Sequence, residues 1–302
     1  MLFRSARFGL AEKAESLGAQ VALLEGPERV DVAELARTAV AAGADLLGVA
    51  GGDGTQALVA GVASQHELPF LCISAGTRNH FAMDLGLDRD DPSTCLDALT
   101  NGIERRIDLG RIGDRTFVNN ASFGAYAEVV RSPAYRDDKR GTTLQMLPDL
   151  LNRTGGEHVL SAHAGDTELV DPQALLVSNN AYEIRDIAGL GQRSRLDGGK
   201  LGVVSVTVDN AAQAIGLVRR GAGRGITALS ADEIIVESPR PEIPVGIDGE
   251  TVMMPTPVRC AIVPGALRVV LPANGAGPPP RRRPFRWRQL WRLARFWSQP
   301  AT

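Results

Sequence analysis

The stretch Leu46-Leu47-Gly48-Val49-Ala50-Gly51-Gly52-Asp53-Gly54-Thr55 carries the strongest structural signal in this chain. Its first half is apolar, which is typical of a buried strand, and its second half is a turn in which three glycines surround one carboxylate. Residues 56–64 are mostly small and apolar and predict a helix directly after the turn. Glycines let the backbone approach a bulky anion, and a helix N-terminus points free N–H groups at it. The stretch therefore predicts a phosphate-binding turn.

Strands and helices alternate around this turn, which indicates a parallel sheet covered on both faces. Ligands of such sheets bind at the carboxyl ends of the strands. A second turn, Ala75-Gly76-Thr77-Arg78-Asn79-His80, also follows an apolar strand, so we expect the two turns to converge on one crevice. The predicted elements are a helix over 9–18, a strand over 20–25, a helix capped by Asp31 that ends at Gly43, strands over 45–50 and 68–74, and helices over 81–85 and about 92–102.

After about residue 106 the pattern changes to short apolar or alternating runs separated by Gly, Pro, Asn and Asp, as in an all-β region. These runs are residues 106–112, 115–121, 159–164, 175–177, 201–208, 233–236, 258–263 and 267–271, and helical segments over about 142–153 and 210–219 interrupt them. We predict an α/β N-terminal domain with a parallel sheet over residues 1–105. A C-terminal β-sandwich domain follows over 106–273, and a linker with a tail over 274–302.

The composition excludes several classes of protein. The 302 residues include 44% apolar and 23% charged side chains, which suffices for ordinary cores. No run reaches the roughly 18 apolar residues of a membrane-spanning helix, and residues 1–20 show no secretory signal pattern. The three widely spaced cysteines are expected to be buried reduced thiols, which fits a cytoplasmic protein.

Three interpretations of the first turn compete with one another. Gly52-Asp53-Gly54-Thr55-Gln56-Ala57 matches the dinucleotide fingerprint G-x-G-x-x-G/A, but the acid expected about 20 residues later is replaced by Ser74-Ala75-Gly76-Thr77. A Walker P-loop is excluded because no Gly-Lys-Ser/Thr follows. A tight turn without any ligand is the third interpretation, and it is weakened because two similar turns follow successive strands.

Together, these motifs resemble the diacylglycerol kinase catalytic domain, a bacterial lipid kinase group related to sphingosine kinases and NAD kinases. GGDGT (51–55) is followed by SAGTRNHFAMDLGL (74–87), and three later motifs occur in the order of that family. The resemblance covers about residues 30–272. The later motifs are Asn119-Asn120-Ala121-Ser122-Phe123-Gly124, Leu196-Asp197-Gly198-Gly199-Lys200-Leu201 and Ile247-Asp248-Gly249-Glu250.

The resemblance implies an ATP site between the two domains. It also implies Mg²⁺, which Asp53 would reach directly or through water. His80 stands where the family often has Asp, and it would either contact the nucleotide or cap a helix. The residues that would line the nucleotide phosphates are Gly51, Gly52, Asp53, Gly54, Thr55 and Gln56 from the first turn, with Thr77 and Asn79 from the second.

The resemblance further implies that the Asp248-Gly249-Glu250 loop faces the transferred phosphoryl group. One of its carboxylates would accept the proton of the attacking hydroxyl. We favour Glu250 as this base, with Asp248 in the metal or base network, and the sequence does not separate the two roles. On its own, Asp-Gly-Glu would be read as a hairpin turn.

The chain departs from the family pattern in two places. The family begins with a strand and an Asn-Pro-x-Ser-Gly turn that closes over ATP, whereas this chain begins MLFRSARFG. We expect that either the start is truncated, with the first strand missing, or the turn is lost. The family also has a structural Mg²⁺ site in an Asp-Asp-Gly-Lys-Leu stretch. Here glycine stands at the usual ligand position, which leaves Asp197 as the substitute metal ligand.

A basic segment ends the chain after a Gly/Pro linker. Residues 281–302 hold seven arginines and no acid, so the rest of the chain carries a net charge of −9 within the total of −2. This segment predicts a helix that binds an anionic membrane surface; docking on the acidic body of the protein and RNA binding are the alternatives. At helical spacing, one face carries Trp287, Leu290, Trp291, Ala294 and Trp297, and the other carries Arg288, Arg292 and Arg295.

We therefore expect an ATP-dependent lipid kinase that transfers the ATP γ-phosphate to a hydroxyl of diacylglycerol or a related lipid. It would act in the cytoplasm, associated peripherally with the inner face of the membrane. The alternatives are a non-catalytic nucleotide- or lipid-binding protein of the same fold and an NAD kinase, for which a membrane-binding tail makes little sense. No nucleic acid is expected as a partner, and the sequence allows a homodimer without fixing it.

Overall fold

The computed structural model describes residues 8–24, 30–125, 127, 159–183, 193–207 and 225–273. The helices predicted over about 142–153 and 210–219 and the basic tail over 281–302 lie outside the described residues. No helix among the described residues is long and apolar enough to cross a membrane.

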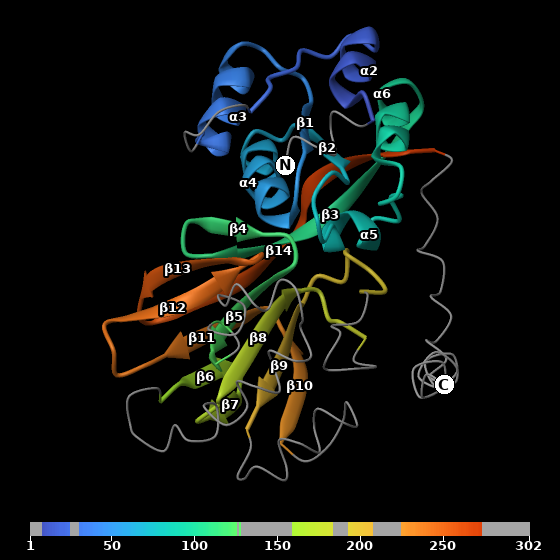
Figure 1. The fold of residues 1–302 in the computed structure, drawn as a ribbon. Helices are drawn as coiled ribbons and strands as arrows, with labels where there is room; N and C mark the ends of the chain where they lie inside the picture. The colour runs from blue at the N-terminus through green and yellow to red at the C-terminus, as the bar shows by residue number, and fades with distance from the viewer. Residues whose placement is uncertain are drawn as a thin grey trace, which may run out of the picture.

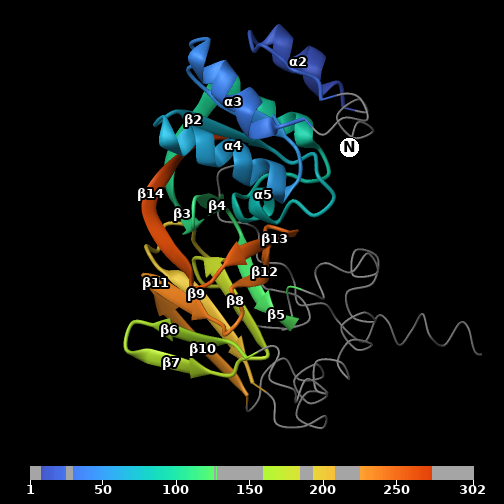
Figure 2. The same cartoon turned by 90° about the vertical axis from the view of Figure 1, so that its left-hand side faces the viewer.

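The first part of the chain alternates helices and strands, and its helices gather at one end of the molecule (Figures 1 and 2). Asp31 caps its helix as predicted, because its carboxylate accepts a hydrogen bond from the N–H of Glu34. The elements are α2 (Leu10–Ser16), α3 (Val32–Ala41), β1 (Leu47–Ala50), α4 (Asp53–Gln65), β2 (Pro69–Ile73), α5 (His80–Asp84), the 3₁₀-helix η1 (Pro92–Asp97) and α6 (Ala98–Asn101).

Two of the predicted elements differ in the structure. The strand predicted over 20–25 is wrong for residues 20–24, which form no strand. Within the described residues β1 pairs with β2 alone, so residues 20–24 do not extend this edge of the sheet. The helix predicted over about 92–102 is split between η1 and α6. Asp91 caps η1, and Pro92 occupies its first turn.

The first sheet is mixed: it contains the parallel strands predicted for the N-terminal part, together with antiparallel ones. β1, β2 and the last strand, β14 (Val258–Pro272), are parallel neighbours. The other pairings of this sheet are antiparallel, in the order β1-β2-β14-β11-β6-β7, with β3 against β14 and β4 against β3. The additional strands are β3 (Gly102–Ile112), β4 (Arg115–Phe117), β6 (Ser161–Ala164), β7 (Thr167–Val170) and β11 (Glu233–Glu237).

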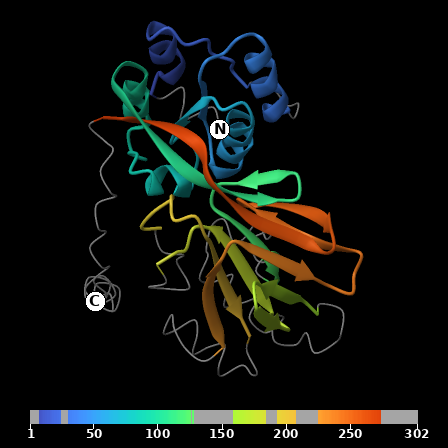
Figure 3. The ribbon, with the colours of Figure 1, turned by 180° about the vertical axis from the view of Figure 1, so that it is seen from behind.

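Strands β3 and β14 run side by side from the helical part into the β-rich part, as Figures 1 and 3 show. The two runs predicted over 258–263 and 267–271 belong to this one strand β14, with a register shift between Val263 and Leu267. On one side of the shift β14 pairs with β11, and on the other side it pairs with β2. The predicted division between residues 105 and 106 falls inside β3, and the division into domains stays a prediction.

The second sheet is antiparallel throughout, in the order β10-β9-β8-β5-β12-β13. One buried cluster combines side chains of both sheets, among them Phe117 and Val258 from the first and Phe123, Val177 and Val245 from the second. The two sheets therefore share a core. The strands of the second sheet are β5 (Asn120–Gly124), β8 (Ala174–Asn179), β9 (Leu201–Val206), β10 (Ile226–Ala231), β12 (Glu242–Ile247) and β13 (Glu250–Pro255).

The β3–β4 hairpin provides a test of this packing. A Cβ on Gly110 would lie 2.1 Å from the ring of the buried Phe117, its cross-strand neighbour. We expect Gly110→Ala to lower the free energy of unfolding by about 1–3 kcal/mol, measured by urea denaturation. Gly48→Ala is the control, because its Cβ would make only an ordinary contact, 3.5 Å from Leu71 Cβ, and should change stability by less than about 0.5 kcal/mol. Equal effects of the two variants would contradict the packing of Phe117 over Gly110.

Candidate functional site

The turn after β1 leaves the N-terminus of α4 without a side-chain cap. Gly52 is the N-cap residue, in an extended conformation, and no side chain caps the helix. Helix N–H groups without intrahelical partners attract anions, and α4 is long enough, at 13 residues, for a substantial dipole. The backbone of the turn is therefore suited to a phosphate group.

The two turns converge, which confirms that prediction. A Cβ on Gly76 would lie 2.3 Å from Gly52 Cα, so only glycine permits this approach of the two backbones. Asn79, at φ 53°, holds the second turn closed. Its Oδ1 accepts from Gly76 N at 2.8 Å, and its Nδ2 donates to the carbonyl oxygens of Ser74 and Gly76 at 3.0 and 2.7 Å. Thr77 lies exposed at the tip of this turn.

Asp53 connects the first turn to the helix after the second. Its Oδ1 accepts from Phe81 N at 2.9 Å and its Oδ2 accepts from His80 N at 3.2 Å, so this carboxylate caps the N-terminus of α5. His80 is thus the first residue of α5, and the side chain that caps this helix is that of Asp53. Asp53 is only 9% exposed. Its position is fixed before any ligand arrives.

Gln56, predicted among the phosphate-lining residues, serves the scaffold in the structure. Its Nε2 donates to the carbonyl oxygens of Val49, Gly51 and Ile73 at 3.1, 3.3 and 3.0 Å, and so joins the carboxyl ends of β1 and β2. The side chain is 2% exposed. Its Oε1 is buried with no hydrogen-bond partner.

The second half of the site is the turn between β12 and β13. Asp248 and Gly249 have φ values of 46° and 93°, which is typical of a two-residue hairpin turn. The Asp248 carboxylate accepts three backbone N–H bonds, from Val118 at 2.8 Å, Asn119 at 2.8 Å and Asn120 at 3.0 Å. The turn is thereby fastened to the segment that leads into β5.

The Asp248 carboxylate is nevertheless poised to bind a proton. Burial raises its pKa from an ordinary value of 3.8 to about 7, against the three backbone N–H groups, which lower the pKa. The negative charge of Asp53 raises it as well. A carboxylate of one half of the site therefore acts on a carboxylate of the other.

Glu250 lies directly against the first turn. A Cβ on Gly54 would be 3.4 Å from Glu250 Oε1, and Glu250 itself is exposed. Both residues line a cavity of about 490 Å³ together with Asp248. Its walls are one face of α4 from Gly54 to Gln65, the start of α3, the β3–β4 turn and the β12–β13 hairpin. Charged side chains also line it: Asp31, Arg37, Asp114 and Arg115.

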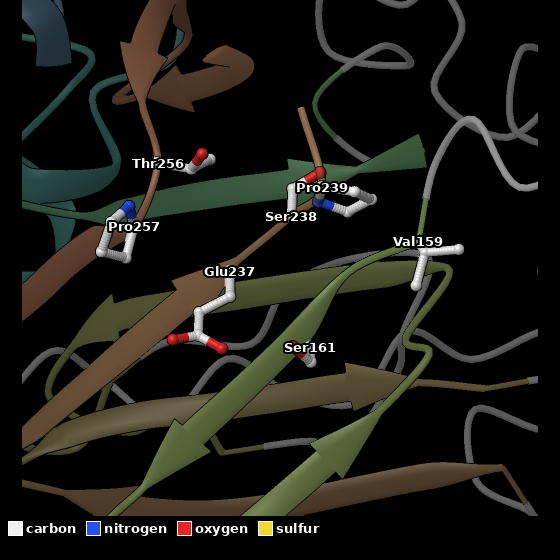
Figure 4. Close-up of a pocket in the computed structure, with 7 residues that line it drawn as sticks. All are labelled: Val159, Ser161, Glu237, Ser238, Pro239, Thr256 and Pro257. Carbon is white, nitrogen blue, oxygen red and sulfur yellow. The ribbon is translucent and has the colours of Figure 1, made fainter. Parts of the chain in front are cut away.

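A second hollow, of about 360 Å³, contains none of the predicted site residues. Figure 4 shows it between the ends of β11 and β6, with Glu237, Ser161 and Thr256 around it. The cavity beside Gly54 and Glu250 is the one that combines the phosphate turn with carboxylates, so it is the candidate site.

The donor chemistry differs between the two Mg²⁺ ions that the resemblance implies. The Mg²⁺ that the resemblance places with the nucleotide phosphates would need only one or two protein carboxylates, and Asp53, Asp248 and Glu250 lie around the phosphate turn. The structural Mg²⁺ does not fit. Asp197 is exposed and pairs with Arg195, with 2.9 Å between Oδ1 and Nε. The described residues contain no group of three His, Cys, Asp or Glu side chains that could hold a metal.

Hydrogen bonds to two other parts of the chain close the loop beside Asp197. Gly198 N donates to Asn180 Oδ1 and Gly199 N donates to Asp108 Oδ2, both at 2.7 Å. Asp108 is buried and also accepts from Gly265 N at 2.9 Å, at the register shift of β14. Asp108 and Asn180 were not among the predicted residues, because neither lies in a motif with a ligand spacing.

The most deeply buried charge near the site was also missed. Arg193 forms an ion pair with Asp84, the last residue of α5, with 2.8 Å between Nε and Oδ2, and the side chains are 0% and 5% exposed. Asp84 lies inside the second motif, and Arg193 lies just before the motif at residues 196–201. That position was the only sequence signal for the pair, and it did not reveal the contact.

Comparison with known proteins matches residues 6–112 to the family described as the diacylglycerol kinase catalytic domain. The diacylglycerol kinase of Bacillus subtilis (strain 168) is 38% identical over 101 residues, which cover 33% of this chain and 33% of that protein. The chain thus matches about a third of the length of this relative. A Pseudomonas aeruginosa protein named "Probable lipid kinase YegS-like" is 29% identical over 287 residues, which cover 89% of this chain and 90% of that protein.

The solved structures agree with this comparison at the level of the fold. A diacylglycerol kinase from Bacillus anthracis str. Sterne has a TM-score of 0.60 at 15% sequence identity, covering 87% of this chain and 89% of that one. The resemblance to the diacylglycerol kinase catalytic domain, predicted from the motifs, is confirmed.

The raised pKa of Asp248 predicts a pH-dependent stability. The folded protein keeps the proton up to about pH 7, whereas the unfolded chain loses it near pH 4. Between these values the folded state binds more protons, so this carboxyl makes the free energy of unfolding fall as the pH rises, by up to about 1.4 kcal/mol per pH unit. Above pH 7 the contribution stops changing. Urea unfolding at several pH values should show a steeper fall from pH 5 to 7 in the wild type than in Asp248→Asn; parallel curves would contradict it.

Proposed function

We propose, from the confirmed resemblance to the diacylglycerol kinase catalytic domain, that this protein transfers the γ-phosphate of ATP to a lipid hydroxyl, most simply that of diacylglycerol. One observation carries the proposal: Glu250 Oε1 would lie 3.4 Å from a Cβ on Gly54, so a carboxylate lies directly beside the phosphate turn. A phosphoryl group bound at the N-terminus of α4 would be within reach of a base.

The backbone of both turns supports the nucleotide part of the proposal. The uncapped N-terminus of α4 supplies N–H groups for the phosphates, and the close approach of Gly52 and Gly76 brings the second turn beside them. The adjacent cavity of about 490 Å³ has room for the rest of a nucleotide. Mg²⁺ bound with the phosphates, which Asp53 would reach directly or through water, would neutralise charge on the transferred group.

Glu250 is the better base of the two loop carboxylates. Asp248 has both oxygens engaged with the N–H groups of residues 118–120, whereas Glu250 is exposed and lines the cavity. In the proposed step the lipid hydroxyl oxygen attacks the γ-phosphorus, and its proton passes to Glu250. The bond from the γ-phosphorus to the β–γ bridging oxygen breaks, and ADP leaves with that oxygen.

Substitution of Glu250 tests the proposal. With radiolabelled ATP and a panel of lipids, we expect Glu250→Gln to lower kcat by about 10²–10⁴-fold, while calorimetry finds ATP affinity within about 3-fold of the wild type. Glu242→Gln is the matched control, because Glu242 is exposed and lies at the far end of the same hairpin. It should leave kcat unchanged.

The assay also separates the alternatives. ATP binding without labelling of any lipid would contradict the kinase proposal and favour a non-catalytic nucleotide-binding protein. Labelling of NAD in place of lipids would favour an NAD kinase. Full activity of Glu250→Gln would contradict the role of Glu250 as the base.

The basic tail completes the proposal, since a lipid substrate has to be reached at a bilayer. Residues 281–302 would bind an anionic membrane surface through arginines and tryptophans. We expect the protein to float with liposomes that contain anionic lipid. Deletion of residues 281–302 should abolish flotation and leave the phosphorylation of a short-chain, dispersed lipid intact. Flotation that survives the deletion would contradict this role of the tail.

A further inference from the structure

Arg193 has an unusual environment for an arginine. It is 1% exposed overall, and its side chain is fully enclosed. One edge of the guanidinium faces the first part of the chain, where Nε donates to Asp84 Oδ2 at 2.8 Å. Its backbone N also donates to Asp84 Oδ1, at 3.4 Å. Asp84 is thus held by the arginine at both of its oxygens.

The other edge of the guanidinium faces the β-rich part. Nη1 donates to the carbonyl oxygens of Val118 and Asn179 at 2.6 and 2.8 Å, and Nη2 donates to Asn119 Oδ1 at 2.7 Å. The guanidinium carbon also lies 5.5 Å from the centre of the Tyr182 ring. Every nitrogen of the planar group therefore has a partner, and together the partners fix the plane in one orientation.

Arg193 binds the same segment, residues 118–119, that binds the Asp248 carboxylate in the Asp248–Glu250 loop. Val118, Asn119 and Asn120 donate their N–H groups to the Asp248 carboxylate, and Arg193 binds the Val118 carbonyl and the Asn119 side chain. On the opposite edge, Asp84 ends α5, whose N-terminus is capped by Asp53 of the phosphate turn. A continuous set of contacts thus joins Asp53 to Asp248 through α5 and Arg193.

We propose that Arg193 is a positioning residue that fixes the Asp248–Glu250 loop against the phosphate turn. This inference rests on the proposed function. A buried ion pair adds little stability compared with apolar side chains of the same volume, so stability alone does not account for it. Reacting groups have to be held within a fraction of an ångström. A planar guanidinium that binds both halves of the site can do this, which accounts for the burial of Arg193 and for its partners.

Arg193→Lys tests the inference, because lysine keeps the charge and loses the planar fork. We expect kcat for the lipid to fall by about 10–100-fold with the KM for ATP within about 3-fold. Hydrogen exchange at the amides of residues 118–120 should be at least about 10-fold faster, while the amides of β9 and β10 stay as protected as in the wild type. Arg259→Lys is the control, because Arg259 forms an exposed ion pair with Glu233. It should change neither quantity.

Asn119→Ala, which removes one acceptor of the guanidinium and keeps the ion pair, serves as a second variant if Arg193→Lys does not fold. It should change kcat and exchange in the same direction. Unchanged kcat and unchanged exchange at residues 118–120 in a folded variant would overturn the inference, as would faster exchange spread evenly over both sheets. If the wild type labels no lipid, the proposed function fails, and the exchange experiment still decides whether Arg193 fixes the loop.

Discussion

The buried guanidinium of Arg193 is a polar contact between the helical part of this molecule and its β-rich part, and it fixes their relative positions. Strands β3 and β14 already join the two parts, because both strands run through them and pair with each other. Long strands bend and twist, however, so they do not fix the orientation of the parts by themselves. The Arg193–Asp84 pair adds a directional constraint at the side where the site lies. Removing one partner of such a pair leaves a buried charge without compensation, which typically costs about 3–5 kcal/mol. The relative placement of the two turns and the β12–β13 loop therefore depends on it.

The three carboxylates of the site are held in three different ways, and this difference separates their roles. Asp53 is committed to the N-terminus of α5, where the helix dipole favours its negative charge. Asp248 is half-buried against three N–H groups, with a pKa of about 7. Glu250 has no such restraint and lines the cavity. Two carboxylates thus organise the backbone around the site, and the third remains available for chemistry.

The phosphate turn and its neighbour show how glycine positions serve the site. Gly76 is required because the two backbones meet there, whereas a Cβ on Gly54 would make only an ordinary contact with the Glu250 side chain. Around the loop beside Asp197, Gly198 and Gly199 donate hydrogen bonds to Asn180 and Asp108. The protein therefore stabilises that loop with donors and acceptors from its own chain.

The local features of this protein follow from the sequence alone. The glycine turn after an apolar strand, the Asp31 cap and the Asp-Gly hairpin turn each depend on residues within a few positions, so periodicity and turn chemistry were enough to predict them. The order of the motifs was likewise sufficient for the family resemblance.

Which distant groups meet follows from the fold and could not be read from the sequence pattern. Arg193 and Asp84 are 109 residues apart, and Asp248 binds N–H groups about 130 residues earlier. From the sequence, Gln56 was predicted to line the phosphates and Asp197 to bind a metal. In the structure, Gln56 donates hydrogen bonds to carbonyl oxygens at the ends of β1 and β2, and Asp197 forms an ion pair with Arg195. Side-chain polarity reveals that a group needs a partner. Which partner it receives follows from the packing of the whole chain, because burial is what makes an unpaired polar group costly.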